Sequence, residues 1–147
     1  MVKNKENVAR AIFSPRMIVD GEIQPETFCL RAAISEEYLS VMRMSVASWQ
    51  DDIRNIPQRK NRRLFGFAEM NVREIRNIQL KRVKYDVKEC DNEKLLSHAG
   101  IFITVDGERL IGGQLLKTIS SGIEQDFLLL AIQRELMDIA QKGLREL

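Results

Sequence analysis

Two Asp-Gly dipeptides, each placed between extended apolar runs, constrain the fold of this chain more than any other feature. Asp-Gly readily supplies the positive-φ positions of a tight hairpin turn. The dipeptides are Asp20-Gly21 and Asp106-Gly107, and the runs that they join are 9–19 with 22–30 and 100–105 with 108–111. Both therefore predict hairpins, and we expect a sheet that is mainly antiparallel.

Regular patterns predict the elements between these hairpins. Residues 37–46 alternate in part and indicate a strand. Ser48 opens a stretch whose apolar residues share one helical face, and Pro57 ends it, which predicts a short middle helix. Residues 64–78 suit a strand followed by a short helix. Residues 82–88 alternate between an apolar and a charged face, so we expect a strand with one buried side.

A long amphipathic stretch follows at the C-terminal end. Ser121 and Glu124 form a capping box, which predicts a helix over 121–147. Its apolar stripe is broader than one sheet face requires. Either the helix lies buried across the sheet, or part of the stripe binds a protein partner or a second copy of the chain. The residues that would form this interface are Phe127, Leu128, Ile132 and Leu136.

Together these elements predict one α+β domain: a mainly antiparallel sheet built from hairpins, a short middle helix and a long C-terminal helix. A chain of 147 residues has the usual size of a single domain. We divide it into a flexible start at 1–7, an α+β body at 8–111 and the helix at 121–147. No apolar run approaches the ~18 residues of a membrane span, and the start lacks the apolar stretch of a signal peptide. We therefore expect a cytoplasmic protein with no membrane partner.

The charges are unevenly distributed, although the net charge is only +2. Residues 54–88 hold 11 Lys/Arg and 3 Asp/Glu, whereas 1–53 hold 6 and 8, and 89–147 hold 6 and 10. Cations gathered in this way bind phosphates with salt-dependent affinity. The segment would contact nucleic acid or an acidic partner protein, and the alternative is a solvated charged face. The candidate binding residues are Arg54, Arg59, Lys60, Arg62, Arg63, Lys81, Arg82, Lys84 and Lys88.

Aromatic residues that would stack on unpaired bases are few near this segment. The options are Phe65, Phe67 and Tyr85, and all three lie in patterns more typical of a core. Aromatic stacking is therefore not a prediction from the sequence.

Catalytic signals are sparse. His98 is the one histidine, and Cys90 lies eight residues before it, so a Cys–His nucleophile pair forms if the intervening turn folds back. The alternative is a histidine that is hydrogen-bonded for structure. With Cys29 as the second cysteine, these residues match no zinc-site spacing, so we expect no metal. Gly112-Gly113 lacks the remainder of a phosphate-binding loop, and we expect no cofactor.

Four short motifs are similar to landmarks of a group of small uncharacterised bacterial proteins. They are Ala11-Ile12-Phe13-Ser14-Pro15, then Gly21 with Phe28, then Leu39-Ser40-Val41-x-Arg43, and Ser97-His98-Ala99-Gly100-Ile101. The resemblance spans about residues 9–105 and implies a bacterial origin and a small mixed fold, but no chemistry. The proline-containing turn that precedes the histidine in that pattern is absent here.

The function that these patterns favour is a non-enzymatic bacterial binding module, acting as a subunit or accessory protein of a larger assembly. The resemblance makes a defence or toxin–antitoxin complex one setting for it. One alternative is a small hydrolase or transferase that uses His98 with Cys90. Another is a structural homodimer formed through the C-terminal helix.

Overall fold

The computed structural model describes residues 1–57, 59–91, 94–114, 116–117, 119 and 122–147. It confirms the α+β class, with an antiparallel sheet, short helices and one long helix near the C-terminal end. The helices are α1 (Trp49–Arg54), α2 (Val72–Arg76) and α3 (Gly122–Lys142), with 3-10 turns at Pro25–Phe28 and Ala32–Ile34. The strands are β1 (Asn7–Ser14), β2 (Ile18–Val19), β3 (Glu22–Ile23), β4 (Leu39–Arg43), β5 (Arg63–Asn71), β6 (Val83–Glu89), β7 (His98–Val105), β8 (Glu108–Arg109) and β9 (Leu144–Glu146).

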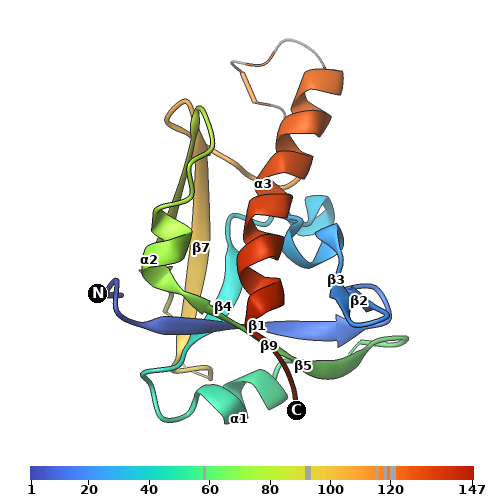
Figure 1. The fold of residues 1–147 in the computed structure, drawn as a ribbon, viewed down its shortest axis with the longest axis vertical. Coiled ribbons are helices and arrows are strands. Elements are labelled where there is room, and N and C mark those ends of the chain that lie inside the picture. The colour runs from blue at the N-terminus through green and yellow to red at the C-terminus, as the bar shows by residue number, and fades with distance from the viewer. Residues whose placement is uncertain (58, 92–93, 115, 118, 120–121) are drawn as a thin grey trace.

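The main sheet has the strand order β6-β7-β4-β1-β5-β9, and β8 pairs with β7 beside this path. Its strand pairs are all antiparallel. Figure 1 shows α3 lying in front of the sheet and crossing β1, with α1 below the strands. The sheet therefore has one face covered by α3 and another on which α1 packs.

Both Asp-Gly turns form as predicted. Asp20 and Gly21 have φ values of 51° and 80°, and Asp106 and Gly107 have 51° and 79°. The first turn joins only the two-residue strands β2 and β3, so the expected pairing of 9–19 with 22–30 is wrong beyond the turn. The reason lies in β1, which is apolar on both faces and pairs instead with β4 on one side and β5 on the other. A strand buried on both faces belongs inside a sheet.

Two apolar clusters hold the sheet between its helices. Along β1, Val8 and Ile12 belong to the cluster under α3, whereas Ala9, Ala11 and Phe13 belong to the cluster on the opposite face. The predicted strand at 82–88 buries alternate residues in the α3 cluster, which confirms its one-sided pattern. β1 is thus the central strand from which both layers are built.

The terminal helix is shorter than the predicted 121–147. It ends at Lys142, and β9 then pairs with β5 at the edge of the sheet. Gly143 permits this change of direction, because a Cβ there would overlap the carbonyl oxygen of Glu69. The predicted cap at Ser121 lies outside the described residues.

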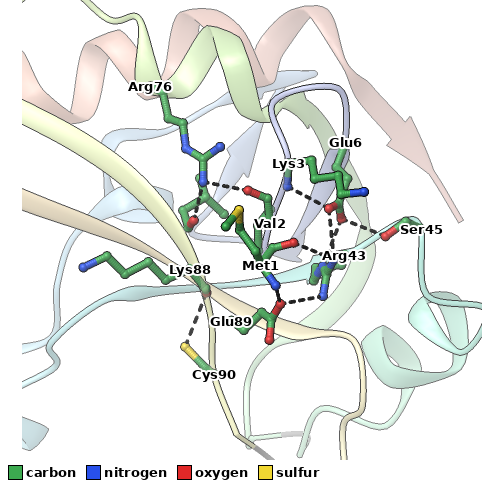
Figure 2. A network of polar contacts seen from close by, with 11 residues as sticks. Met1, Val2, Lys3, Glu6, Arg43, Ser45, Arg76, Lys88, Glu89 and Cys90 are labelled. Carbon is green, nitrogen blue, oxygen red and sulfur yellow. Dashed lines mark hydrogen bonds and ion pairs between the residues drawn. The ribbon is translucent and has the colours of Figure 1, made fainter.

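The start of the chain is packed, in contrast to the flexible 1–7 that the sequence predicts. Val2 is 2% exposed and Glu6 is 8% exposed. Figure 2 shows the polar network that holds this segment: both carboxylate oxygens of Glu6 accept hydrogen bonds from Arg43 at 2.9 Å, and Arg76 donates to the Val2 carbonyl oxygen at 2.9 Å. The composition of this segment gives no signal for these contacts, because Arg43 and Arg76 are distant from it in sequence.

Candidate functional site

A cleft of about 740 Å³ opens beside the place where β1 and β4 separate. The two strands pair only at Val8 with Arg43 and at Ala9 with Met42. Beyond that point the side chain of Arg10 bridges neighbouring segments: Nη1 donates to Ser40 O at 2.7 Å, while Nε and Nη2 donate to Thr27 O at 3.1 and 2.8 Å. A guanidinium group thus occupies the wall of the cleft.

The cleft is strongly cationic. Its lining includes six cationic residues and two acidic ones, an excess of four positive charges. The six are Arg10, Arg16, Arg31, Arg59, Lys60 and Arg62, and the two are Glu26 and Glu36. Arg16 pairs with Glu26 at 3.5 Å and Arg31 with Glu36 at 3.1 Å. Among the described residues, the other four cations have no carboxylate within ion-pair distance.

The cations are close enough to perturb one another. Burial lowers the pKa of Arg10 to about 10, and Arg31 and Arg62 act in the same direction against the opposing charge of Glu36. Burial also lowers the pKa of Arg62, and the charges of Arg59 and Arg31 add to that effect. Arg10 remains protonated at neutral pH, so these groups repel one another in the structure.

Two buried polar atoms of the lining have no hydrogen-bond partner among the described residues. Arg62 stacks on Phe13, with its guanidinium carbon 3.9 Å from the ring centroid, and donates to Pro57 O at 3.1 Å. In the part of the chain that the structure describes, Arg62 Nε and His98 Nδ1 are buried with no hydrogen-bond partner. Buried polar atoms normally have partners, so two unpartnered atoms beside one cleft are unusual.

His98 and Cys90 lie near one another, with Cys90 N donating to His98 O at 3.2 Å, but among the described residues no hydrogen bond joins the thiol to the imidazole. His98 Nε2 lies 3.1 Å from Ser40 Oγ, and the Cys90 thiol contacts Lys88 O at 3.8 Å and the Tyr38 hydroxyl. Burial lowers the pKa of His98, which favours neutral imidazole. Burial raises the pKa of Cys90 more than the Tyr38 hydrogen bond lowers it, which favours neutral thiol. An activated thiolate would need the opposite shifts.

A buried carboxylate positions this part of the cleft. Asp52 of α1 is 4% exposed and accepts hydrogen bonds from Ser97 N at 3.0 Å, Ser97 Oγ at 2.5 Å and Ser48 Oγ at 3.0 Å. Burial opposes its ionisation, but the hydrogen bonds from Ser97 and Ser48 leave the pKa below its usual value. These hydrogen bonds fix the position of Ser97, the residue just before His98.

The predicted basic segment is divided into two groups. Arg59, Lys60 and Arg62 line the cleft, whereas Arg54 and Arg63 are exposed outside it. The remaining four candidates belong to β6 and the turn before it, and β7, β4 and β1 lie between β6 and β5. Those four are Lys81, Arg82, Lys84 and Lys88. The nine cations therefore do not form one surface.

The predicted helix interface is also divided. Ile132 and Leu136 are 1% and 0% exposed in the core under α3, so neither is available to a partner, and that part of the prediction is wrong. Leu128 packs partly against the same core. Phe127 is 72% exposed. The broad apolar stripe is thus explained mainly by burial, because α3 lies against both the sheet and neighbouring loops.

Sequence reasoning missed the cations that come from outside the basic segment. Arg10 and Arg31 belong to the acidic first third of the chain, where charge counting gives no signal. The signal that the sequence did contain is Arg10, a charged residue within the apolar run of β1, because arginine is mostly found exposed.

Comparisons of the chain with protein-family models, with curated proteins and with solved structures give no match. Among the described residues, none of the helices is both long and apolar enough to span a membrane. The function is therefore argued from the cleft itself.

Proposed function

We propose that this chain is a non-enzymatic binding module whose cationic cleft holds phosphate groups of a nucleic acid. The carrying observation is the excess of four positive charges in the cleft, where burial, and then the neighbouring guanidinium groups, lower the pKa values of Arg10 and Arg62. A bound polyanion relieves that repulsion and releases its own counterions, and both effects favour association.

The orphaned atoms support the same interpretation. Phosphate oxygens accept hydrogen bonds from guanidinium groups, and Arg62 Nε is a donor without a partner among the described residues. Arg10 is rigidly held by carbonyl oxygens, which keeps its charge in the wall at little further entropic cost on binding.

The test is a pair of matched double variants. Arg59→Ser with Lys60→Ser removes two cations that line the cleft, whereas Arg54→Ser with Arg63→Ser removes two exposed cations of the same neighbourhood that do not. Affinity for a labelled oligonucleotide, measured by fluorescence anisotropy, should fall at least roughly tenfold at low salt for the first variant and little for the second.

Equal losses in both variants would mean that net charge, and not the cleft, determines binding. No binding by the wild-type chain to either single-stranded or duplex oligonucleotides at low salt would overturn the proposal. Binding of a polyglutamate peptide in place of either oligonucleotide would instead identify an acidic protein as the partner.

A further inference from the structure

An aromatic strip lies on the α1-side face of the sheet, next to the cleft. The Tyr38 ring covers Gly100 of β7, where an added Cβ would lie 2.7 Å from a ring carbon. Tyr38 lies between two other rings, with centroids 5.1 Å from Phe102 and 5.7 Å from His98. Tyr38 and Phe102 are half-buried, so part of each ring remains exposed.

Cations flank the outer end of this strip. Lys88 Nζ lies 5.3 Å and the Arg109 guanidinium carbon 5.0 Å from the centroid of Phe102. Both side chains are exposed, as is Lys84 four residues before Lys88 in β6. Long exposed cations over a ring move aside at low cost, because cation–π contacts at exposed sites are worth only about 0.5–1 kcal/mol.

The strip is continuous with the cleft through His98. This residue lines the cleft and contacts Tyr38, and its Nε2 lies 3.1 Å from Ser40 Oγ, another residue of the cleft lining. His98 is itself 8% exposed, but through its contacts the rings of Tyr38 and Phe102 lie next to the lining of the cleft on one side and near Lys88 and Arg109 on the other.

We propose that the ligand is a single-stranded nucleic acid, whose phosphates occupy the cationic cleft while adjacent unpaired bases stack on Tyr38 and Phe102. This inference rests on the proposed function and narrows it to one class of ligand. In a duplex the base faces are already stacked inside the helix, so only an unpaired strand can present them to an aromatic strip. Base stacking tolerates any sequence, and we expect little sequence preference.

The experiment compares a short labelled oligothymidylate with a duplex of equal length, using the wild-type chain and two aromatic variants. The first variant is Tyr38→Leu with Phe102→Leu, which keeps apolar bulk on the sheet and removes the rings. The control is Phe127→Leu, which removes an aromatic residue that is 72% exposed on α3. Circular dichroism and thermal melting establish that each variant is folded before binding is measured.

The wild-type chain should bind the single strand more tightly than the duplex. The Tyr38/Phe102 variant should bind the single strand roughly tenfold or more weakly, with an unchanged dependence on salt, because stacking releases no counterions. The Arg59/Lys60 variant should lower the slope of log K against log salt by about 1.4, since each phosphate contact on a single strand contributes about 0.7.

The two proposals fail in different ways. Equal affinity for both ligands, or an unchanged affinity of the folded Tyr38/Phe102 variant, overturns the single-strand inference while the cleft variant still tests the proposed function. A salt slope that is unaffected by Arg59→Ser with Lys60→Ser overturns the phosphate-binding cleft itself. If the aromatic variant does not fold, the wild-type preference between the single strand and the duplex decides alone.

Discussion

The N-terminal network and the cleft both gather charged side chains in partly buried positions, but they do so with opposite electrostatics. In the network, hydrogen bonds from Arg43 lower the pKa of Glu6 to about 2, and the bond to Glu6 raises the pKa of Arg43. In the cleft, burial and neighbouring cations lower the pKa values of Arg10 and Arg62.

The difference distinguishes charged groups that stabilise the fold by pairing with one another from charged groups that are available to a ligand. A carboxylate and a guanidinium in bidentate contact satisfy one another and need nothing further. Like charges placed together repel one another and lower the stability of the fold. Their presence therefore needs a reason other than stability. Clusters of the second kind are candidates for function, as perturbed groups in a cleft generally are.

Breaking the Glu6–Arg43 pair of the N-terminal network should have the largest effect on stability. Glu6→Gln leaves Arg43 without its closest charge partner, and we expect the free energy of unfolding to fall by about 2–3 kcal/mol. Chemical denaturation measures this as a shift of the midpoint at constant slope. The exposed Glu22 provides a control, since Glu22→Gln should change stability by less than about 0.5 kcal/mol. Equal effects of the two substitutions would contradict the role of the network.

The contribution of the same pair to stability should depend on pH. The pKa of Glu6 falls from 4.5 to about 2 on folding, so its contribution is fully present above about pH 4.5 and is lost as pH falls toward 2. A shift of this size corresponds to about 3 kcal/mol. The stability curve of Glu6→Gln should therefore lie closer to that of the wild type at pH 2.5 than at pH 6. Parallel curves at both pH values would show that Glu6 titrates normally.

Adding an anion should stabilise the folded protein through the cleft, and this effect should be smaller. A ligand present at ten times its dissociation constant stabilises the folded state by about 1.4 kcal/mol, so inorganic phosphate should raise the melting temperature more than sodium chloride of equal ionic strength. Arg59→Ser with Lys60→Ser should remove the difference, while Arg54→Ser with Arg63→Ser should keep it. An equal response of the two variants would place the anion elsewhere.

Local signals in the sequence predicted the local elements well. The Asp-Gly turns, the alternating strand β6, the β-branched strand β7 and the short helix α1 each depend on neighbouring residues, and each forms. The terminal helix was overextended because Gly143 acts through a contact with Glu69, which is distant in sequence. β9 was missed for the same reason.

The site depends on long-range assembly and was predicted only in part. Arg59, Lys60 and Arg62 stood out in the basic segment, but Arg10 and Arg31 come to the cleft from another third of the chain. Charge counting also joined β6 to the loop before β5, although three strands of the sheet lie between them. Strand order is a tertiary property, and no local pattern specifies it.

The central claim is that the cleft arginines accept an anion while the network arginines do not. An NMR titration of the arginine Nε–Hε signals with inorganic phosphate, at constant ionic strength, reports on both groups in one sample. The account predicts saturable shifts for Arg59 and Arg62, with the signals of Arg43 and Arg76 unchanged. Shifts of equal size at all four arginines, or none at Arg62, would contradict it.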